Sequence, residues 1–417
     1  MASSQTVSSW TEDEARNLPS KTLIQGIFSK SHSIKISEYS RFLNRDQYRQ
    51  IGQGQCGTIY AIQDRRVRKD LGSRSTAVLK LANYPRKVSE IRNDHEKHIS
   101  VAETFLQTSS ISKEGSDIDI PDVLSDPLET ESTWFWGLAG AGAHPLGSPK
   151  DGFFTSRIYP IPEVVRAALV DVYAPRSLQE KEAKQKFLDK EQQADCLVRI
   201  YLGRRLAKGE ERPLSNENFT LRNFPLHVNE MEDLGLDTHQ YAKIMARSLA
   251  LLHWAARNDA NDVEFVLGTT ASSISSYIQK DSDDFEVGMW LLDFNQCQTL
   301  ENDLDRRIKQ LVDGFFWNDP YYPRPNLKGN KEDVILWTTF KETYLEVGKT
   351  ILQNTREEDH PAQFLAAVEE KGESRSQSAF STAGQNGSPS VFASLFDWKS
   401  LAWSLFGLIL LAWSLPR

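Results

Sequence analysis

The stretch IGQGQCGTIYA, residues 51–61, predicts two β-strands joined by a glycine-rich turn. Gly52, Gly54 and Gly57 follow the spacing G-x-G-x-x-G, and glycine lets a backbone approach a phosphate group closely. Further along, the run AVLKL at 77–81 predicts another strand, with Lys80 among apolar residues. A lysine on a neighbouring strand can reach the phosphates under such a loop. Together the two patterns predict a nucleotide site, which requires carboxylates from elsewhere in the chain.

Composition limits the class of protein. The chain has 417 residues, a net charge of -8 and 39% hydrophobic residues, which is typical of a soluble globular protein with one large or two modest domains. The acidic balance argues against nucleic acid as a partner. Cys56, Cys196 and Cys297 are far apart and odd in number, which favours a reducing intracellular compartment. The polar N-terminus does not predict a secretory signal.

A carboxylate is expected on the helix predicted for residues 88–107. Its apolar residues recur at helical spacing, and a glutamate here could pair with Lys80. We predict Glu96 for this role because a further turn of helix follows it. Glu103, on nearly the same face, is the rival, and both could instead be solvated surface charges.

Two aspartates in the second half of the chain complete the pattern. The predicted helix 239–254 is followed by RNDANDVE (257–264) and a short apolar strand, which predicts Asp259 as a catalytic base and Glu264 as a metal ligand. The strand in WLLDFN (290–295) delivers Asp293, a second expected metal ligand, with Asn295 where a glycine is usual. Asparagine tolerates positive φ better than most residues.

These five features occur in the order found in protein kinases, so we predict an α+β, two-lobed, protein-kinase-like fold over residues 46–355. The N-lobe is expected at about 46–230, with an insertion near 109–150, and the C-lobe at about 231–355. A polar leader is expected at 1–45 and a flexible linker at 356–390, where Ser, Gly and Gln become frequent. A separate hydrophobic tail follows at 391–417.

The chain also resembles a specific family. The motifs that carry the resemblance are LHVNEM (226–231), ALLHW (250–254), DVEFVLG (262–268), WLLDFNQC (290–297) and NDPYYPRP (318–325). They are similar to a family of filamentous-fungal proteins of unknown function, whose members are sometimes labelled zinc-finger proteins. The resemblance implies a fungal source and no assigned activity. Zinc is not expected, because the eight histidines and three cysteines show no structural ligand spacing.

Departures from the kinase pattern leave two functions open. Arg257 and Asn258 replace the His-Arg of H-R-D, no A-P-E motif follows Asp293, and Glu264 replaces an asparagine. Mg²⁺ accepts a glutamate ligand, but three carboxylates without metal would repel one another. The chain is therefore expected to be an ATP- and Mg²⁺-dependent phosphotransferase acting on an unknown acceptor. The alternative is a pseudokinase that binds partners, with or without nucleotide.

The C-terminal tail, 391–417, is expected to contact a membrane. Residues 400–415 contain no charge, and Trp398, Trp403 and Trp413 suit the headgroup boundary. The run is shorter than the roughly 17 residues needed to span a bilayer. A spanning anchor, an in-plane membrane helix and a poorly predicted exon are the alternatives, and a helix that packs back on the body is the competing explanation. Membrane contact would leave the kinase-like body in the cytosol.

Overall fold

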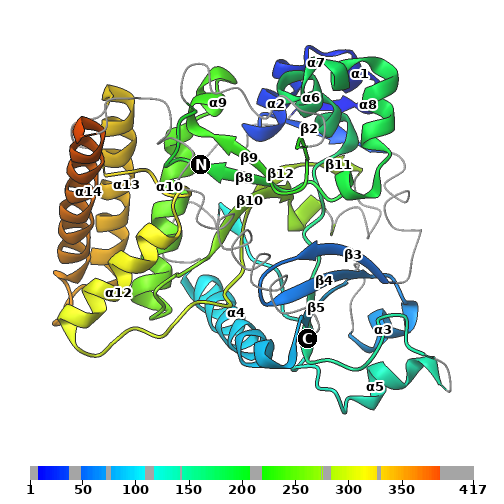
Figure 1. Ribbon diagram of the computed structural model, residues 1–417, viewed down its shortest axis with the longest axis horizontal. Coiled ribbons are helices and arrows are strands. Elements are labelled where there is room, and N and C mark those ends of the chain that lie inside the picture. The colour runs from blue at the N-terminus through cyan, green and yellow to red at the C-terminus, as the bar shows by residue number, and fades with distance from the viewer. Residues whose placement is uncertain are drawn as a thin grey trace, which may run out of the picture. The chain divides into compact units, whose positions relative to one another are not determined.

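The computed structural model describes residues 8–36, 48–71, 77–108, 117–140, 143–206, 218–273, 275, 283–325 and 330–385. Contacts divide the chain into a first unit, Met1–Val368, and a second, Glu369–Arg417. The first unit is a mixed α+β structure whose described residues form three sheets. The paragraphs below describe this unit (Figure 1).

An antiparallel sheet of four strands bears the glycine-rich stretch. Its order is β3 (Tyr48–Gln53), β4 (Gly57–Ile62), β5 (Ala77–Ala82) and β7 (Gly152–Ser156). Side chains alternate between the two faces of a strand, so Leu79 and Leu81 pack into one apolar cluster while Lys80 points to the other face. The long helix α4 (Val88–Thr108) lies against β5 and β7.

A mixed sheet of five strands forms the centre of the larger part of the unit. Its order is β6 (Ile118–Asp119), β12 (Val287–Leu292), β10 (Glu264–Thr269), β8 (Val198–Tyr201) and β9 (Phe224–His227). In the antiparallel β10–β12 pair, Glu264 lies opposite Leu292. This register brings the start of β10 close to Asp293, the residue that follows β12.

Helices surround this sheet. In chain order they are α6 (Glu163–Tyr173), α7 (Arg176–Gln179), α8 (Lys181–Leu188), α9 (Val228–Asp233), α10 (Thr238–Ala250), α12 (Leu304–Trp317), α13 (Lys331–Leu352) and α14 (His360–Gln385). A turn of π-helix, Leu251–Ala255, extends α10, and α10 packs along α13. Two short helices, α3 (Arg65–Asp70) and α5 (Thr133–Trp136), flank the four-stranded sheet.

The predicted polar leader is folded in its described part, residues 8–36. Residues 8–36 form β1 (Ser8–Thr11), α1 (Glu12–Asn17), α2 (Ser20–Phe28) and β2 (His32–Lys35), and β11 (Asp284–Phe285) joins β1 and β2 in a third sheet. The reason lies in α2, where Leu23, Ile24 and Ile27 form an apolar stripe at helical spacing and are buried in the main core.

Three other predicted segments differ from expectation or pack into the core. The four-stranded sheet ends at Ser156, well before 230, because β8 and β9 pair within the five-stranded sheet. The predicted insertion, 109–150, contributes Leu128 and Phe135 to the core of the four-stranded sheet within its described part. The predicted linker, 356–390, overlaps α14, which begins at His360 and buries Phe364, Leu365 and Val368.

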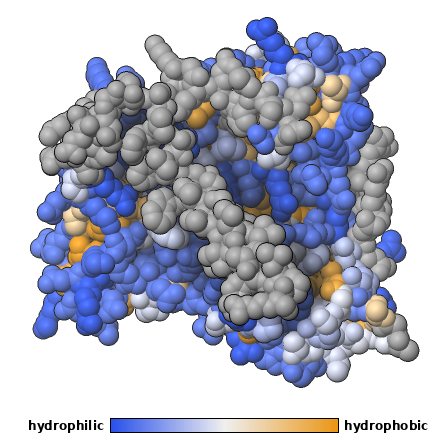
Figure 2. Space-filling view, viewed as in Figure 1, coloured by the Kyte–Doolittle hydropathy of each residue, from blue (hydrophilic) through white to orange (hydrophobic). Residues whose placement is uncertain are grey.

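One face of the described structure is mostly polar. Figure 2 shows one face on which hydrophilic residues predominate among the coloured atoms and hydrophobic patches are small. Within the described residues, no helix is both long and apolar enough to cross a membrane. The tail, 391–417, lies outside these residues, so its membrane contact stays a prediction.

Replacing Phe364 tests the contribution of α14 to the core. The side chain is fully buried, and its ring lies 5.0 Å from that of His253 and 5.3 Å from that of Tyr344. We expect Phe364→Ala to lower the free energy of unfolding by about 3–5 kcal/mol, because it leaves a cavity. Urea denaturation measures the change. The exposed neighbour Gln363 is the control, and an equal loss in Gln363→Ala would contradict the packing of α14.

Candidate functional site

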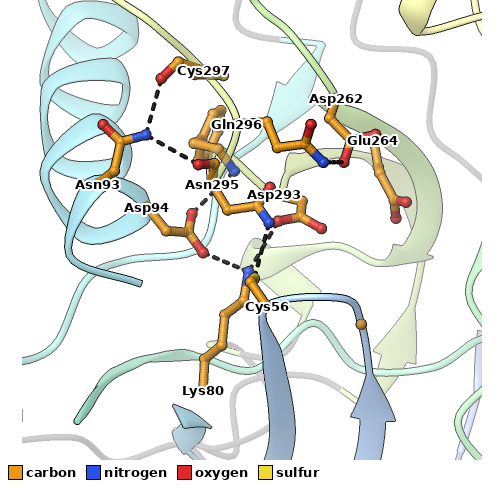
Figure 3. A network of polar contacts seen from close by, with 12 residues as sticks. Cys56, Lys80, Asn93, Asp94, Asp262, Glu264, Asp293, Asn295, Gln296 and Cys297 are labelled. Atoms are coloured by element: carbon orange, nitrogen blue, oxygen red, sulfur yellow. Dashed lines mark hydrogen bonds and ion pairs between the residues drawn. The ribbon is translucent and has the colours of Figure 1, made fainter. Parts of the chain in front are cut away.

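The ammonium group of Lys80 lies between two carboxylates from different parts of the chain. Lys80 Nζ donates to Asp94 Oδ2 on α4 at 2.5 Å and to Asp293 Oδ1, directly after β12, at 2.9 Å (Figure 3). The side chain of Lys80 is 13% exposed, that of Asp94 3% and that of Asp293 29%. The structure thus brings together Lys80 and Asp293, two residues predicted from motifs more than two hundred positions apart.

The charge of Lys80 is stabilised by its partners. Burial alone would lower the pKa of Lys80, but the charges of Asp293 and Asp94 outweigh it and hold the pKa well above its usual value. Lys80 is therefore a fixed cation. A buried cation is tolerated where it is paired and hydrogen-bonded, as here.

The prediction that Glu96 pairs with Lys80 is wrong, because Asp94 takes this role. Glu96 and its rival Glu103 are both exposed on α4. Two positions along an α-helix correspond to a rotation of about 200°, so Glu96 points away from the face that carries Asp94. The buried face of α4 repeats at Ile91, Asp94, His98, Val101 and Phe105. A carboxylate inside this regular stripe is the sequence signal for Asp94.

Asp94 and its neighbour Asn93 also bind the segment after Asp293. Asp94 Oδ1 accepts the backbone N–H of Phe294 at 3.0 Å. Asn93 Nδ2 donates to the carbonyls of Asn295 at 3.1 Å and Cys297 at 2.9 Å. Two adjacent residues of α4 therefore hold both the side chain of Lys80 and the backbone that follows Asp293.

The three glycines of the loop differ in how much space a side chain would find at each position. A Cβ at Gly57 would lie 3.0 Å from the carbonyl of Leu81 and 3.1 Å from Lys80 Cγ, so a side chain there would have to push these neighbours aside by a few tenths of an ångström. At Gly52 a Cβ would lie 3.1 Å from Ile59 Cβ. At Gly54 the nearest atom, the carbonyl oxygen of Gly57, would be 3.8 Å away, which is ordinary contact. Gly54 is thus the member of the motif that leaves room beside its backbone.

A contact across the site joins the glycine loop to the residue that replaces the expected glycine. Asn295 Nδ2 donates to Cys56 Sγ at 2.9 Å, and both side chains are buried. Burial raises the pKa of the Cys56 thiol, so it stays protonated at neutral pH. Asn295 therefore links the loop to the Asp293 segment.

Asp259 does not belong to the Lys80 network, which corrects its predicted placement. Its side chain is 5% exposed, and its oxygens accept the backbone N–H groups of Asn261 at 3.2 Å and Gln298 at 2.8 Å, and Gln310 Nε2 at 3.0 Å. Burial raises the pKa of Asp259 against these hydrogen bonds. The hydrogen bond from Gln310 connects the loop that contains Asp259 to α12, which lies about fifty residues later in the sequence.

Glu264 lies near Asp293 but is paired with a cation. It is on the same side of the site as Asp262 and Asp293 (Figure 3). Its carboxylate binds Arg199 Nη2 of β8 at 2.7 and 2.8 Å. Asp262, which was not predicted, accepts Gln296 Nε2 at 2.7 Å. The segment just after Asp293 thus contacts the loop through Asp262.

The structure does not contain a preformed metal centre in its described part. Within those residues, no group of three or more His, Cys, Asp or Glu side chains is placed to hold a metal ion. Asp293 pairs with Lys80 and Glu264 pairs with Arg199. Either carboxylate would have to share or leave its cation to bind Mg²⁺.

One family model matches part of the chain. Residues 289–356 match DUF3669, which is described as a zinc finger protein. The matched segment contains a single cysteine, Cys297, and no histidine, whereas a structural zinc site takes four such ligands. No curated protein matches the chain. The family match agrees with the label suggested by the resemblance and assigns no activity.

Asp94 and Glu96 make a matched pair for testing the ion-pair network. We expect Asp94→Asn to lower the free energy of unfolding by about 3 kcal/mol, because it removes the charge of one partner in a buried pair. Glu96→Gln, at an exposed site, should change it by less than about 0.5 kcal/mol. Urea denaturation of both variants measures the difference. Equal losses would contradict the assignment of Asp94.

A second ion pair fixes the loop that precedes β10. Arg257 Nη1 and Arg307 Nη1 each bind the carboxylate of Glu357 at 2.6 Å. Burial alone would raise the pKa of Glu357, but the hydrogen bonds and charges of the two arginines outweigh it and lower the pKa to about 2. The turn before α14 thus contributes an anion to the loop.

This pair predicts a pH dependence of stability. A carboxylate whose pKa is lower in the folded than in the unfolded state stabilises the fold above the unfolded pKa. The contribution of Glu357 should therefore be full above about pH 4.5 and be lost as the pH falls toward 2. Urea denaturation between pH 7 and pH 3 should show a smaller loss of stability in Glu357→Gln than in the native chain. Identical pH profiles would contradict the pairing.

Proposed function

We propose that the chain is a kinase-like nucleotide-binding protein, in which Lys80 binds nucleotide phosphates. The observation that carries this proposal is the position of Lys80, a permanently charged and mostly buried cation between Asp94 and Asp293. The order of elements supports it as well. A glycine-rich hairpin, a lysine strand, a helix with a carboxylate and a hairpin that ends in an aspartate follow one another as in kinases.

The sheet face around Lys80 is suited to a nucleotide base. Lys80 lies opposite Ile59 on β4 and Phe153 on β7. Two positions away on the same face, Val78 lies opposite Ala61 and Thr155. This gives a mainly apolar strip beside the cation. A flat base could lie against the partly exposed members of the strip, Ile59 and Val78, while its phosphates reach Lys80.

The fit to Mg²⁺ is better for Asp293 than for Glu264. Asp293 is partly exposed and its bond to Lys80 uses Oδ1. Glu264 is bound through both oxygens to Arg199, a buried cation whose charge it balances. We therefore propose Asp293 as a metal ligand and assign Glu264 to the ion pair. When bound, Mg²⁺ would neutralise phosphate charge.

A pseudokinase is the second candidate, and one observation favours it. Asp259, the expected base, is buried and hydrogen-bonded to three donors outside the Lys80 network. A base must lie within hydrogen-bond reach of the proton that it abstracts. If no other carboxylate replaces Asp259, the protein binds nucleotide or a partner without phosphoryl transfer.

Thermal unfolding with ATP and Mg²⁺ tests the proposal. A ligand that binds the native state alone stabilises it by about 2.7 kcal/mol at a hundredfold excess over its dissociation constant. We expect ATP with Mg²⁺ to raise the Tm of the native chain and not that of Lys80→Ala. Each shift is measured against the same variant without ligand, because Lys80→Ala also loses its ion pairs.

Lys87→Ala is the matched control. Lys87 pairs with Glu90, and both residues lie outside the Lys80 network. Lys87→Ala should therefore retain the rise in Tm with ATP and Mg²⁺. If the native chain shows no shift with ATP, both nucleotide hypotheses fail. If Lys80→Ala retains the full shift, the nucleotide does not bind at Lys80.

A further inference from the structure

We infer that Asp262, and not Asp259, is the carboxylate that accepts a proton from the acceptor hydroxyl. This inference rests on the proposed nucleotide site at Lys80. It assigns a catalytic role within the site to a residue that the kinase pattern does not indicate. The substrate class that follows is a molecule with a hydroxyl group, because this is the group that a carboxylate base can activate beside a phosphoryl donor.

The two aspartates of the loop contact different surroundings. Asp259 is bound to Gln310 on α12 and to the backbone of Gln298. Asp262 is partly exposed, and its Oδ2 accepts Gln296 Nε2 at 2.7 Å. Gln296 belongs to the segment that begins with Asp293. Figure 3 shows Asp262 on the side of the network toward which the carboxylate of Asp293 points.

The backbone of the loop is strained at Asp262. Ala260 has φ 54° and Asp262 φ 65°, and Asp293 shares this left-handed conformation at φ 67°. Such conformations are unfavourable at most residues other than glycine and concentrate at functional sites. Asp262 and Asp293 thus share this conformation, and Gln296, three residues after Asp293, binds the carboxylate of Asp262.

A buried amide maintains this conformation. Asn318, at the C-terminal end of α12, is 3% exposed. Its Oδ1 accepts the N–H of Asp262 at 2.7 Å, and its Nδ2 donates to the carbonyl of Ala260 at 2.8 Å. Two hydrogen bonds from one rigid side chain thus fix the residues on either side of Asn261.

The proposed step is a phosphoryl transfer. The acceptor oxygen forms a bond to the terminal phosphorus, its O–H bond breaks, and the proton moves to the Asp262 carboxylate. The bond from that phosphorus to the bridging oxygen breaks, and the nucleoside diphosphate leaves with the bonding electrons. Lys80 stabilises the phosphate charge during the transfer. Gln296 orients Asp262.

The test compares Asp262→Asn with Asp259→Asn in the full-length chain. With Mg²⁺ and ATP, water serves as the acceptor and phosphate release is measured. We expect Asp262→Asn to lose about 100-fold of the hydrolysis rate, as is usual for removal of a general base. Asp259→Asn, assayed below its Tm, should stay within a few-fold of the native rate, because Asp259 has a structural role.

A binding measurement decides the matter where the native chain hydrolyses ATP too slowly. Titration calorimetry without metal compares ATP with ADP. Removing a negative charge beside the terminal phosphate should tighten ATP binding about threefold to tenfold in Asp262→Asn and leave ADP binding unchanged. Asp259→Asn should bind both nucleotides as the native chain does.

The outcomes separate this inference from the proposed function. Nucleotide binding by the native chain, with equal effects of the two variants on hydrolysis and on ATP affinity, would overturn the role of Asp262 and leave the nucleotide site standing. A larger effect of Asp259→Asn would restore the sequence prediction. Failure of the native chain to bind nucleotide would overturn the proposed function, and the role of Asp262 with it.

Discussion

The ion pairs of Lys80 join the two main sheets through their side chains. A strand of the first sheet supplies the cation, α4 supplies Asp94, and the end of β12 in the second sheet supplies Asp293. An unpaired ammonium in this position would cost several kcal/mol of desolvation, so the three elements have to approach together. The glycine hairpin depends on the same contact, because Gly57 packs directly against the Lys80 side chain.

Sequence patterns located the parts of the site that depend on local structure. The glycine spacing, Lys80 within an apolar strand and Asp293 at the end of another are signals contained in short stretches, and the structure brings the last two into contact. The mixed α+β class also follows from such stretches, since a strand and a helix differ in the spacing of their apolar residues. The details of the kinase-like fold and its nucleotide remain proposals.

Residues whose place depends on distant partners were not predicted correctly. The choice between Asp94 and Glu96 depends on the rotation of α4, which its packing on β5 and β7 sets. The burial of Asp259 depends on Gln298 and Gln310, which belong to later segments. The pairing of Glu264 with a cation depends on β8 lying next to β10. None of these neighbours can be identified from spacing within one motif.

The two bonds of Asp94 have a consequence for communication through the molecule. One oxygen binds Lys80 and the other accepts the backbone N–H of Phe294, so a single carboxylate contacts both the cation and the turn beside it. An anion that draws Lys80 toward itself changes the first bond and, through the shared carboxylate, the second. By thermodynamic linkage, a partner whose affinity for α4 changes by some factor when the anion binds would change the affinity for the anion by that same factor. Through Asp94, α4 is therefore in direct contact with both Lys80 and the backbone that follows Asp293.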